Sequence, residues 1–152
     1  MSIAEIERYL HSSVPLCRAM GVSVREASPA RVRLAAPLAP NLNPHASVFG
    51  GSAVAIAILA AWTLLTVRER AAGYGAGLII QRSSMRYERP ITADFEALCE
   101  LTDEARYARF RALLERRGRA RITLTAWLQQ DTVRAASFEG DFVGLRARER
   151  PR

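Results

Sequence analysis

Hydrophobic and polar residues alternate with a period of two over much of the chain, which predicts a protein built largely from β-strands. Residues 21–36 form a predicted hairpin that turns at Ser28 and Pro29, because apolar and polar positions alternate on both sides of that turn. The same alternation predicts four further strands in the second half of the chain, at residues 77–87, 94–101, 122–128 and 133–143.

A continuous apolar segment interrupts this alternation after Gly50 and Gly51, and it predicts a helix from Ser52 to about Arg70. All residues between Ser52 and Thr63 are apolar, and a helix that is apolar on every side must be buried on every side. A membrane span is the alternative, but this apolar run of about 16 residues is shorter than the roughly 20 that a span needs. We therefore expect a core helix with a sheet wrapped around it, and no membrane partner.

Three more helices complete the predicted order of elements. Two short helices at residues 3–11 and 15–20 precede the hairpin, and a surface helix at 102–117 ends before Gly118. One long apolar helix among six strands with hairpin connections predicts an α+β protein of the hotdog fold, in which an antiparallel sheet is wrapped around the central helix. We expect a single domain over residues 1–145 and a basic disordered tail at 146–152.

Composition agrees with a globular protein, since 49% of residues are hydrophobic and 24% are charged. The net charge of +7 suits an anionic partner such as coenzyme A or an acidic carrier protein, although dispersed arginines also fit a plain solvated surface. No basic motif interleaved with aromatic residues indicates nucleic-acid binding. Cys17 and Cys99 lie in apolar surroundings and are expected to be reduced core thiols, and the acidic residues near the N-terminus do not resemble an export signal, so we expect a cytoplasmic protein.

The segment NLNPHASVFGGS at residues 41–52 carries the candidate chemistry. Unpaired backbone N–H groups at a helix start, beside the glycines Gly50 and Gly51, would let a thioester carbonyl approach and would stabilise its oxyanion. Ser52 could contact the same oxygen, while Asn43 and His45 could orient or deprotonate a water molecule. Simpler interpretations also stand: tight packing for the glycines, a helix cap for Ser52 and a turn for the asparagines.

Three segments resemble a known family over nearly the whole chain: PLCRAMGV at 15–22, APLAPNLNPHASVFGGSAVAIAILAAWTLL at 36–65, and SSMRYERPITADFEALCE at 83–100. The chain resembles a bacterial thioesterase-like hotdog family, whose domain occurs alone or fused behind an acetyltransferase domain. The resemblance implies a homodimer or a dimer of dimers with active sites at subunit interfaces. It also implies hydrolysis of acyl-CoA or acyl-carrier-protein thioesters without a metal or bound cofactor, coenzyme A entering only as part of the substrate.

One departure concerns the base that would activate water. Many hotdog thioesterases carry a histidine before the glycine pair and a carboxylate within the helix, but here Phe49 replaces the histidine and residues 57–60 contain no acid. The base would then come from His45 or Asn43, from Ser83, Ser84 or Asp94 on neighbouring strands, or from the partner subunit. An asparagine can orient water but cannot accept its proton.

The remaining candidates are residues that would bind the substrate. The arginines near the strand that flanks the helix start are candidates for the coenzyme A phosphates, or they form a solvated strand face. Trp62 and Trp127 are expected in the core or an interface, where they could line an acyl tunnel. The full predicted substrate-binding set is Asn41, Phe49, Arg82, Ser83, Ser84, Arg86 and Arg89.

Three functions follow from these residues. The first is a thioester hydrolase in which water attacks a carbonyl held at residues 50–52. The second is a non-catalytic thioester-binding or regulatory module, which the missing helix acid favours. The third is a hotdog dehydratase, in which a loop histidine removes a proton next to the thioester carbonyl, but this reaction needs a paired acid that the helix lacks.

Overall fold

The computed structural model describes residues 1–146 and begins with two short helices. Helix α1 (Ile3–Ser13) is capped by Ser2, whose hydroxyl accepts from the Glu5 N–H while the Glu5 carboxylate accepts from the Ser2 N–H. Helix α2 (Pro15–Ala19) follows, and the positive φ of 68° at Gly21 turns the chain into the first strand. The two predicted N-terminal helices are therefore confirmed.

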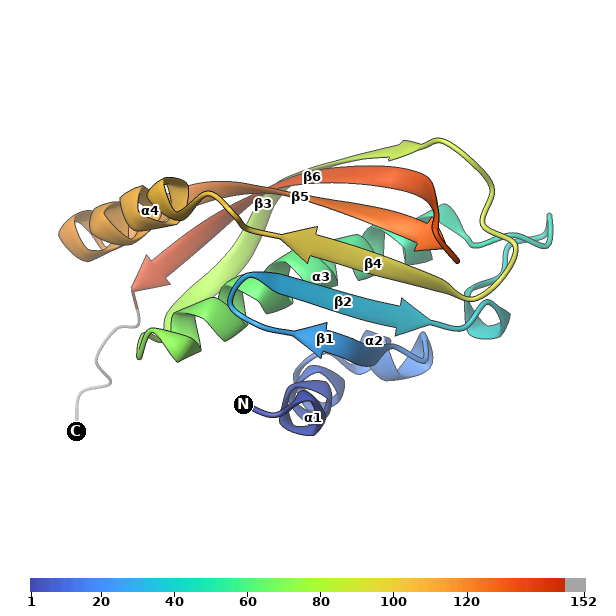
Figure 1. Ribbon diagram of the computed structural model, residues 1–152, viewed down its shortest axis with the longest axis horizontal. Coiled ribbons are helices and arrows are strands. Elements are labelled where there is room, and N and C mark those ends of the chain that lie inside the picture. The colour runs from blue at the N-terminus through green and yellow to red at the C-terminus, as the bar shows by residue number, and fades with distance from the viewer. Residues whose placement is uncertain (147–152) are drawn as a thin grey trace.

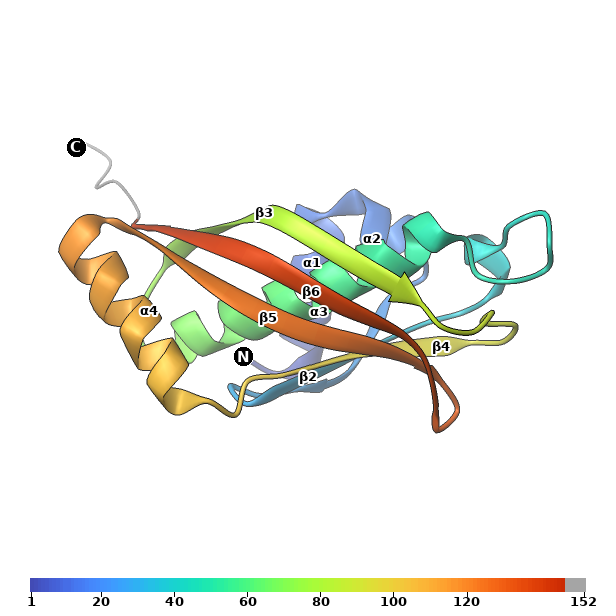
Figure 2. The ribbon, with the colours of Figure 1, turned by 90° about the horizontal axis from the view of Figure 1, so that it is seen from above.

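Within residues 1–146, six strands form one antiparallel sheet in the order β1-β2-β4-β5-β6-β3 (Figures 1 and 2). The predicted hairpin consists of β1 and β2, and the four later strands also occur where the alternation places them, β5 and β6 being longer than predicted. Strand β6 continues through Arg146, so the predicted tail beyond it lies outside the described residues. The strands are β1 (Ser23–Ala27), β2 (Arg31–Ala36), β3 (Ala76–Tyr87), β4 (Phe95–Glu100), β5 (Arg119–Gln130) and β6 (Val133–Arg146).

Helix α3 (Gly50–Ala71) lies along the inner face of this sheet, as Figures 1 and 2 show from two sides, and it contacts every strand from β2 to β6. Its buried side chains pack against the inward residues of the strands, among them Leu34, Phe95 and Phe142. By length and hydropathy α3 could also cross a membrane, a property it shares with core helices. The sheet curled around one apolar helix is the predicted hotdog fold.

One face of α3 is only half-buried, so the prediction of burial on every side is wrong for a single chain. We call this the open helix face and define it by Val54, Ala55, Ile58 and Trp62. It lies beside β3, since the Trp62 indole N–H donates to the Leu78 carbonyl at 3.0 Å. Strand β3 pairs with β6 alone within residues 1–146, and its other edge is unpaired.

Helix α4 (Glu104–Arg117) follows β4 and packs at the far end of α3 (Figure 1). Asp103 caps its first turn by accepting from the Arg106 N–H, and Gly118 ends it with a φ of 71°. Phe110 and Leu114 pack directly over Gly144, where a Cβ would overlap the Phe110 ring. The predicted surface helix and its glycine stop are confirmed.

Both cysteines are free and buried, as predicted. Burial raises the pKa of the Cys17 thiol, and it raises the pKa of Cys99 to about 12. Both sulfurs therefore stay protonated at neutral pH and act as small core side chains.

Candidate active site

The loop between β2 and α3 is held in place by its own polar groups. Asn41 is buried, and its side-chain amide donates to the carbonyls of Met20 at 2.9 Å and Pro37 at 2.7 Å. The Asn41 carbonyl accepts from the Phe49 N–H at 2.7 Å, which fixes the residue before the helix. Asn41 thus supports the loop from within, and its amide nitrogen is not free for a substrate.

Asn43 organises the tip of the same loop. Its side-chain oxygen accepts from the N–H groups of His45 at 2.8 Å and Ser47 at 3.2 Å, and its amide nitrogen donates to the Ser47 hydroxyl at 2.9 Å. These bonds stabilise the turn, in which Ala46 has a φ of 57°. Both polar atoms of the Asn43 side chain are used inside the loop, as the turn interpretation of this residue expects.

Helix α3 begins at Gly50, two residues earlier than predicted. Its N-cap is Phe49, which offers no side-chain hydrogen bond, so of the two roles considered for Ser52 the helix cap is wrong. Ser52 lies inside the first turn, where its own N–H is one of the unpaired groups. Among residues 1–146 no acceptor is bonded to the N–H groups of Gly50, Gly51 and Ser52, whereas the Ala53 N–H donates to the Phe49 carbonyl at 3.0 Å.

A cleft of about 550 Å³ opens at this helix start. This volume is typical of small-molecule sites, which occupy about 300–1,000 Å³. Gly50 and Gly51 form part of its wall, so a ligand in the cleft can reach the positive end of the helix. The cleft is lined by Ser47, Val48, Gly50, Gly51, Ala53, Tyr87, Glu88, Arg89, Pro90, Ile91 and Ala136.

Two residues of the cleft, Tyr87 and Glu88, are absent from the predicted site. The Tyr87 hydroxyl donates to the Gly50 carbonyl at 2.9 Å, which ties the end of β3 to the first turn of α3. Within residues 1–146, Glu88 is the only carboxylate that lines the cleft, and one of its oxygens accepts from the Ser137 hydroxyl at 3.0 Å. Both belong to the sequence RYERP, of which only the arginines are in the predicted substrate-binding set.

The structure places the predicted base candidates away from the cleft walls. His45 is exposed at the tip of the loop and does not line the cleft. Asp94 is exposed and accepts from the Leu38 N–H at 2.9 Å. Ser83 and Ser84 lie on exposed parts of β3, opposite Gly140 and Glu139.

The three predicted phosphate-binding arginines occupy different surroundings. Arg89 lines the cleft, whereas Arg86 is exposed on β3 outside it. Arg82 donates to Asp141 at 2.9 Å and to Glu139 at 2.7 Å, so its charge is already balanced within the chain. Phe49 is exposed, and its ring lies against Gly51, but it does not line the cleft.

The sheet, its central helix and the cleft at the helix start together define a hotdog protein. The chain belongs to the family described as "Putative thioesterase (yiiD_Cterm)", whose model matches residues 3–146. Among solved structures, a Chlorobaculum tepidum protein of unknown function superposes with a TM-score of 0.88 at 25% identity, over 95% of this chain and 94% of that one.

Two further structures share the fold at lower identity. A Shewanella oneidensis protein described as a "putative thioesterase" has a TM-score of 0.83 and 24% identity, over 94% of this chain and 96% of its own. A Pseudomonas aeruginosa protein described as a "Probable Thioesterase" has a TM-score of 0.83 and 19% identity, over 97% of both chains. The predicted family and fold are therefore confirmed.

Proposed function

We propose that this protein hydrolyses acyl thioesters, either acyl-CoA or acyl carrier protein, at the start of α3. The observation that carries the proposal is the set of unpaired N–H groups at Gly50, Gly51 and Ser52, two of whose residues line an open cleft. Membership of a thioesterase family supports the same reaction.

The reaction follows from this geometry. The thioester oxygen accepts hydrogen bonds from the helix amides, and the partial positive charge of the helix end stabilises the oxyanion that develops when water attacks the carbonyl carbon. The tetrahedral intermediate then collapses, the carbon–sulfur bond breaks and the thiolate leaves. A Cβ at Gly51 would overlap the Phe49 ring, which would have to move, and one at Gly50 would lie 3.3 Å from the Tyr87 hydroxyl oxygen.

Glu88 is the base that we propose for the attacking water. It is the one carboxylate that lines the cleft in the described part of the chain, whereas the first turn of α3 contains no acid and His45 lies outside the cleft. The bond from Ser137 occupies one carboxylate oxygen and orients the group, while the second oxygen has no bonded partner among the described residues. That second oxygen would accept the proton from water as its oxygen attacks the carbonyl.

The remaining parts of the proposal concern assembly and setting. The open helix face and the unpaired edge of β3 support a homodimer, or a dimer of dimers, since both expose groups that a second copy would cover. We further propose a cytoplasmic protein that uses no metal or bound cofactor and has no nucleic-acid or membrane partner.

A thiol-release assay over acyl-CoA and acyl-carrier-protein substrates of different chain lengths tests the hydrolysis. We expect turnover, and we expect Gly51→Ala to lower kcat/KM by about tenfold or more, because the displaced Phe49 ring disturbs access to the amides. Gly75→Ala is the matched control, since a Cβ there meets nothing within 4 Å. If every substrate binds but none is hydrolysed, the protein is instead a thioester-binding module.

Replacing Glu88 tests the base. Glu88→Gln keeps a partner for Ser137 but cannot accept a proton, so we expect kcat to fall by about 100-fold or more. Ser137→Ala, which removes only the orienting bond, should cost far less, and His45→Ala should leave the rate unchanged. If Glu88→Gln keeps the full kcat, or if His45→Ala lowers kcat strongly, the base is a loop residue and not Glu88.

A further inference from the structure

A second hollow lies at the other end of the molecule, where the end of α4 meets the start of β5. We call it the basic groove, and its volume is about 460 Å³, similar to that of the cleft at the helix start. It is lined by Gln81, Leu113, Arg117, Arg119, Ala120, Arg121 and Val143. Three of these seven residues are arginines, while Leu113, Ala120 and Val143 supply an apolar surface.

The three arginines of the basic groove are exposed and have no ion-pair partner within residues 1–146. Arg121 also interacts electrostatically with Asp141, but that carboxylate is already bonded to Arg82 and to the Thr123 hydroxyl. The groove therefore gathers positive charge that the described part of the chain does not neutralise.

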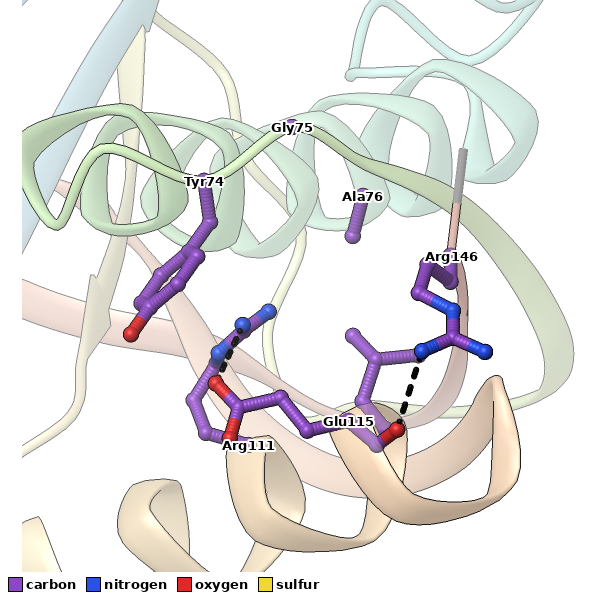
Figure 3. A pocket seen from close by; sticks show the side chains of 7 residues that line it. Tyr74, Gly75, Ala76, Arg111, Glu115 and Arg146 are labelled. Carbon is purple, nitrogen blue, oxygen red and sulfur yellow. Dashed lines mark hydrogen bonds and ion pairs between the residues drawn. The ribbon is translucent and has the colours of Figure 1, made fainter. Parts of the chain in front are cut away.

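A neighbouring hollow provides a contrast, because its arginines are used internally. Figure 3 shows Arg111 bonded to the Glu115 carboxylate and Arg146 bonded to the Glu115 carbonyl, at 3.0 and 3.1 Å. Arg111 also pairs with Glu69 and stacks over the Tyr74 ring, with 3.5 Å between its guanidinium carbon and the ring centroid. Of these two hollows, only the basic groove is therefore lined by arginines without a partner among the described residues.

The basic groove is separate from the cleft at the helix start. Strand β6 contributes Ala136 to the cleft and Val143 to the groove. Seven residues of a strand span roughly 23 Å, and an odd spacing points the two side chains to opposite faces of the sheet. A ligand of the groove therefore does not occupy the proposed catalytic position in the same chain.

We propose that the basic groove binds the phosphate groups of a nucleotide, with its base or ribose against Leu113 and Val143. Guanidinium groups match phosphate oxygens in charge and in hydrogen-bonding geometry. A hollow of about 460 Å³ suits a small molecule. The nucleotide is either a free molecule or the nucleotide end of coenzyme A.

Binding of ADP to the full chain, measured by calorimetry at low salt, tests this site. We expect saturable binding that weakens with added salt. The affinity for ADP should fall by about tenfold in Arg119→Ala, and by about tenfold more in the double variant that also carries Arg121→Ala. Arg109→Ala is the matched control, since Arg109 is an exposed arginine of α4 that does not line the groove. Melting temperatures of all variants would establish that each is folded.

The source of the nucleotide follows from kinetics with the same variants. If the double variant raises KM for acyl-CoA but not for the acyl thioester of pantetheine, the groove binds the nucleotide end of the substrate. The acyl end of that substrate then lies in the cleft of another chain, or in a cleft that the substrate reaches around the sheet edge. If ADP binding falls while both KM values stay unchanged, the groove is a site for a free nucleotide. Absence of ADP binding, or an equal loss in Arg109→Ala, would overturn the proposal, whichever result the hydrolysis assay gives.

Discussion

Asp141 shows how single hydrogen bonds set the behaviour of an ionisable side chain in this protein. The Arg82 side chain donates to one carboxylate oxygen at 2.9 Å, and the Thr123 hydroxyl donates to the other at 2.7 Å. Arg82 first, and then Thr123, lower the pKa of Asp141, because both stabilise its charged form. A carboxylate of this kind links folding to pH.

The expected pH dependence has a definite sign. An unfolded aspartate has a pKa of about 3.9, and Asp141 contributes stability that is complete above this value and is lost as pH falls through its lower folded pKa. Asp141→Asn should therefore show a smaller fall in unfolding free energy between pH 6 and pH 3 than wild type, measured by urea denaturation. Asp131→Asn changes an exposed turn and should show the same fall in unfolding free energy as wild type. An equal fall in all three proteins would contradict the role of Asp141 in the pH dependence.

Individual site residues could be predicted only where their neighbours in the chain decide their role. The place of Gly50 and Gly51 at the helix start could be predicted, because a glycine pair before an apolar helix is a local feature of the sequence. Tyr87 and Glu88 follow β3, and they reach the helix start only because β3 pairs with β6 and both strands curve around α3. No spacing in the sequence encodes that proximity.

Between elements, the contact of α3 with α4 depends on a buried ionic cluster. The Glu69 carboxylate is almost fully buried and accepts from the Tyr107 hydroxyl at 2.7 Å and from Arg111 at 2.8 Å. Burial, together with the Glu69 bond, raises the pKa of Tyr107, so the phenol stays protonated as a donor. Arg68 lies over the Tyr107 ring and pairs with Glu104 at the start of α4.

Removing the central carboxylate should loosen α4. Glu69→Ala leaves Arg111 and Tyr107 without their shared buried acceptor, and we expect a loss of about 2–3 kcal/mol in unfolding free energy. Glu115→Ala removes the other acceptor of Arg111, but that pair is exposed at the glutamate, so a cost below about 1 kcal/mol is expected. Urea denaturation followed by circular dichroism would measure both, and similar costs would show that the cluster is not the anchor.

At the scale of the whole molecule, the open helix face is only half-buried, so the single chain does not completely cover its central helix. Apolar residues of α3 remain accessible beside β3, and β3 has a free edge within the described residues. Ile79 on this strand is 56% exposed. Apolar surface next to an unpaired edge strand favours association with a second copy.

The association predicts a mass of twice the chain's 16.8 kDa, or a multiple of it, in light scattering coupled to size-exclusion chromatography. Ile58→Glu places a charge on the open helix face and should shift the protein toward the monomer, while circular dichroism reports whether it remains folded. Ile3→Glu makes the same change at an exposed residue of α1 and should leave the mass unchanged. A wild-type protein of 16.8 kDa at micromolar concentration would refute the dimer.

The sequence by itself determined the elements and their class, because period-two alternation, a run of apolar residues and glycine or proline stops are local properties of the chain. It therefore predicted six strands, the central helix and the position of the glycine pair. Tertiary structure alone decided which carboxylate shares the cleft, which arginines are neutralised and which face of α3 stays open. Those outcomes depend on the order and curvature of the strands, which bring residues far apart in sequence into contact.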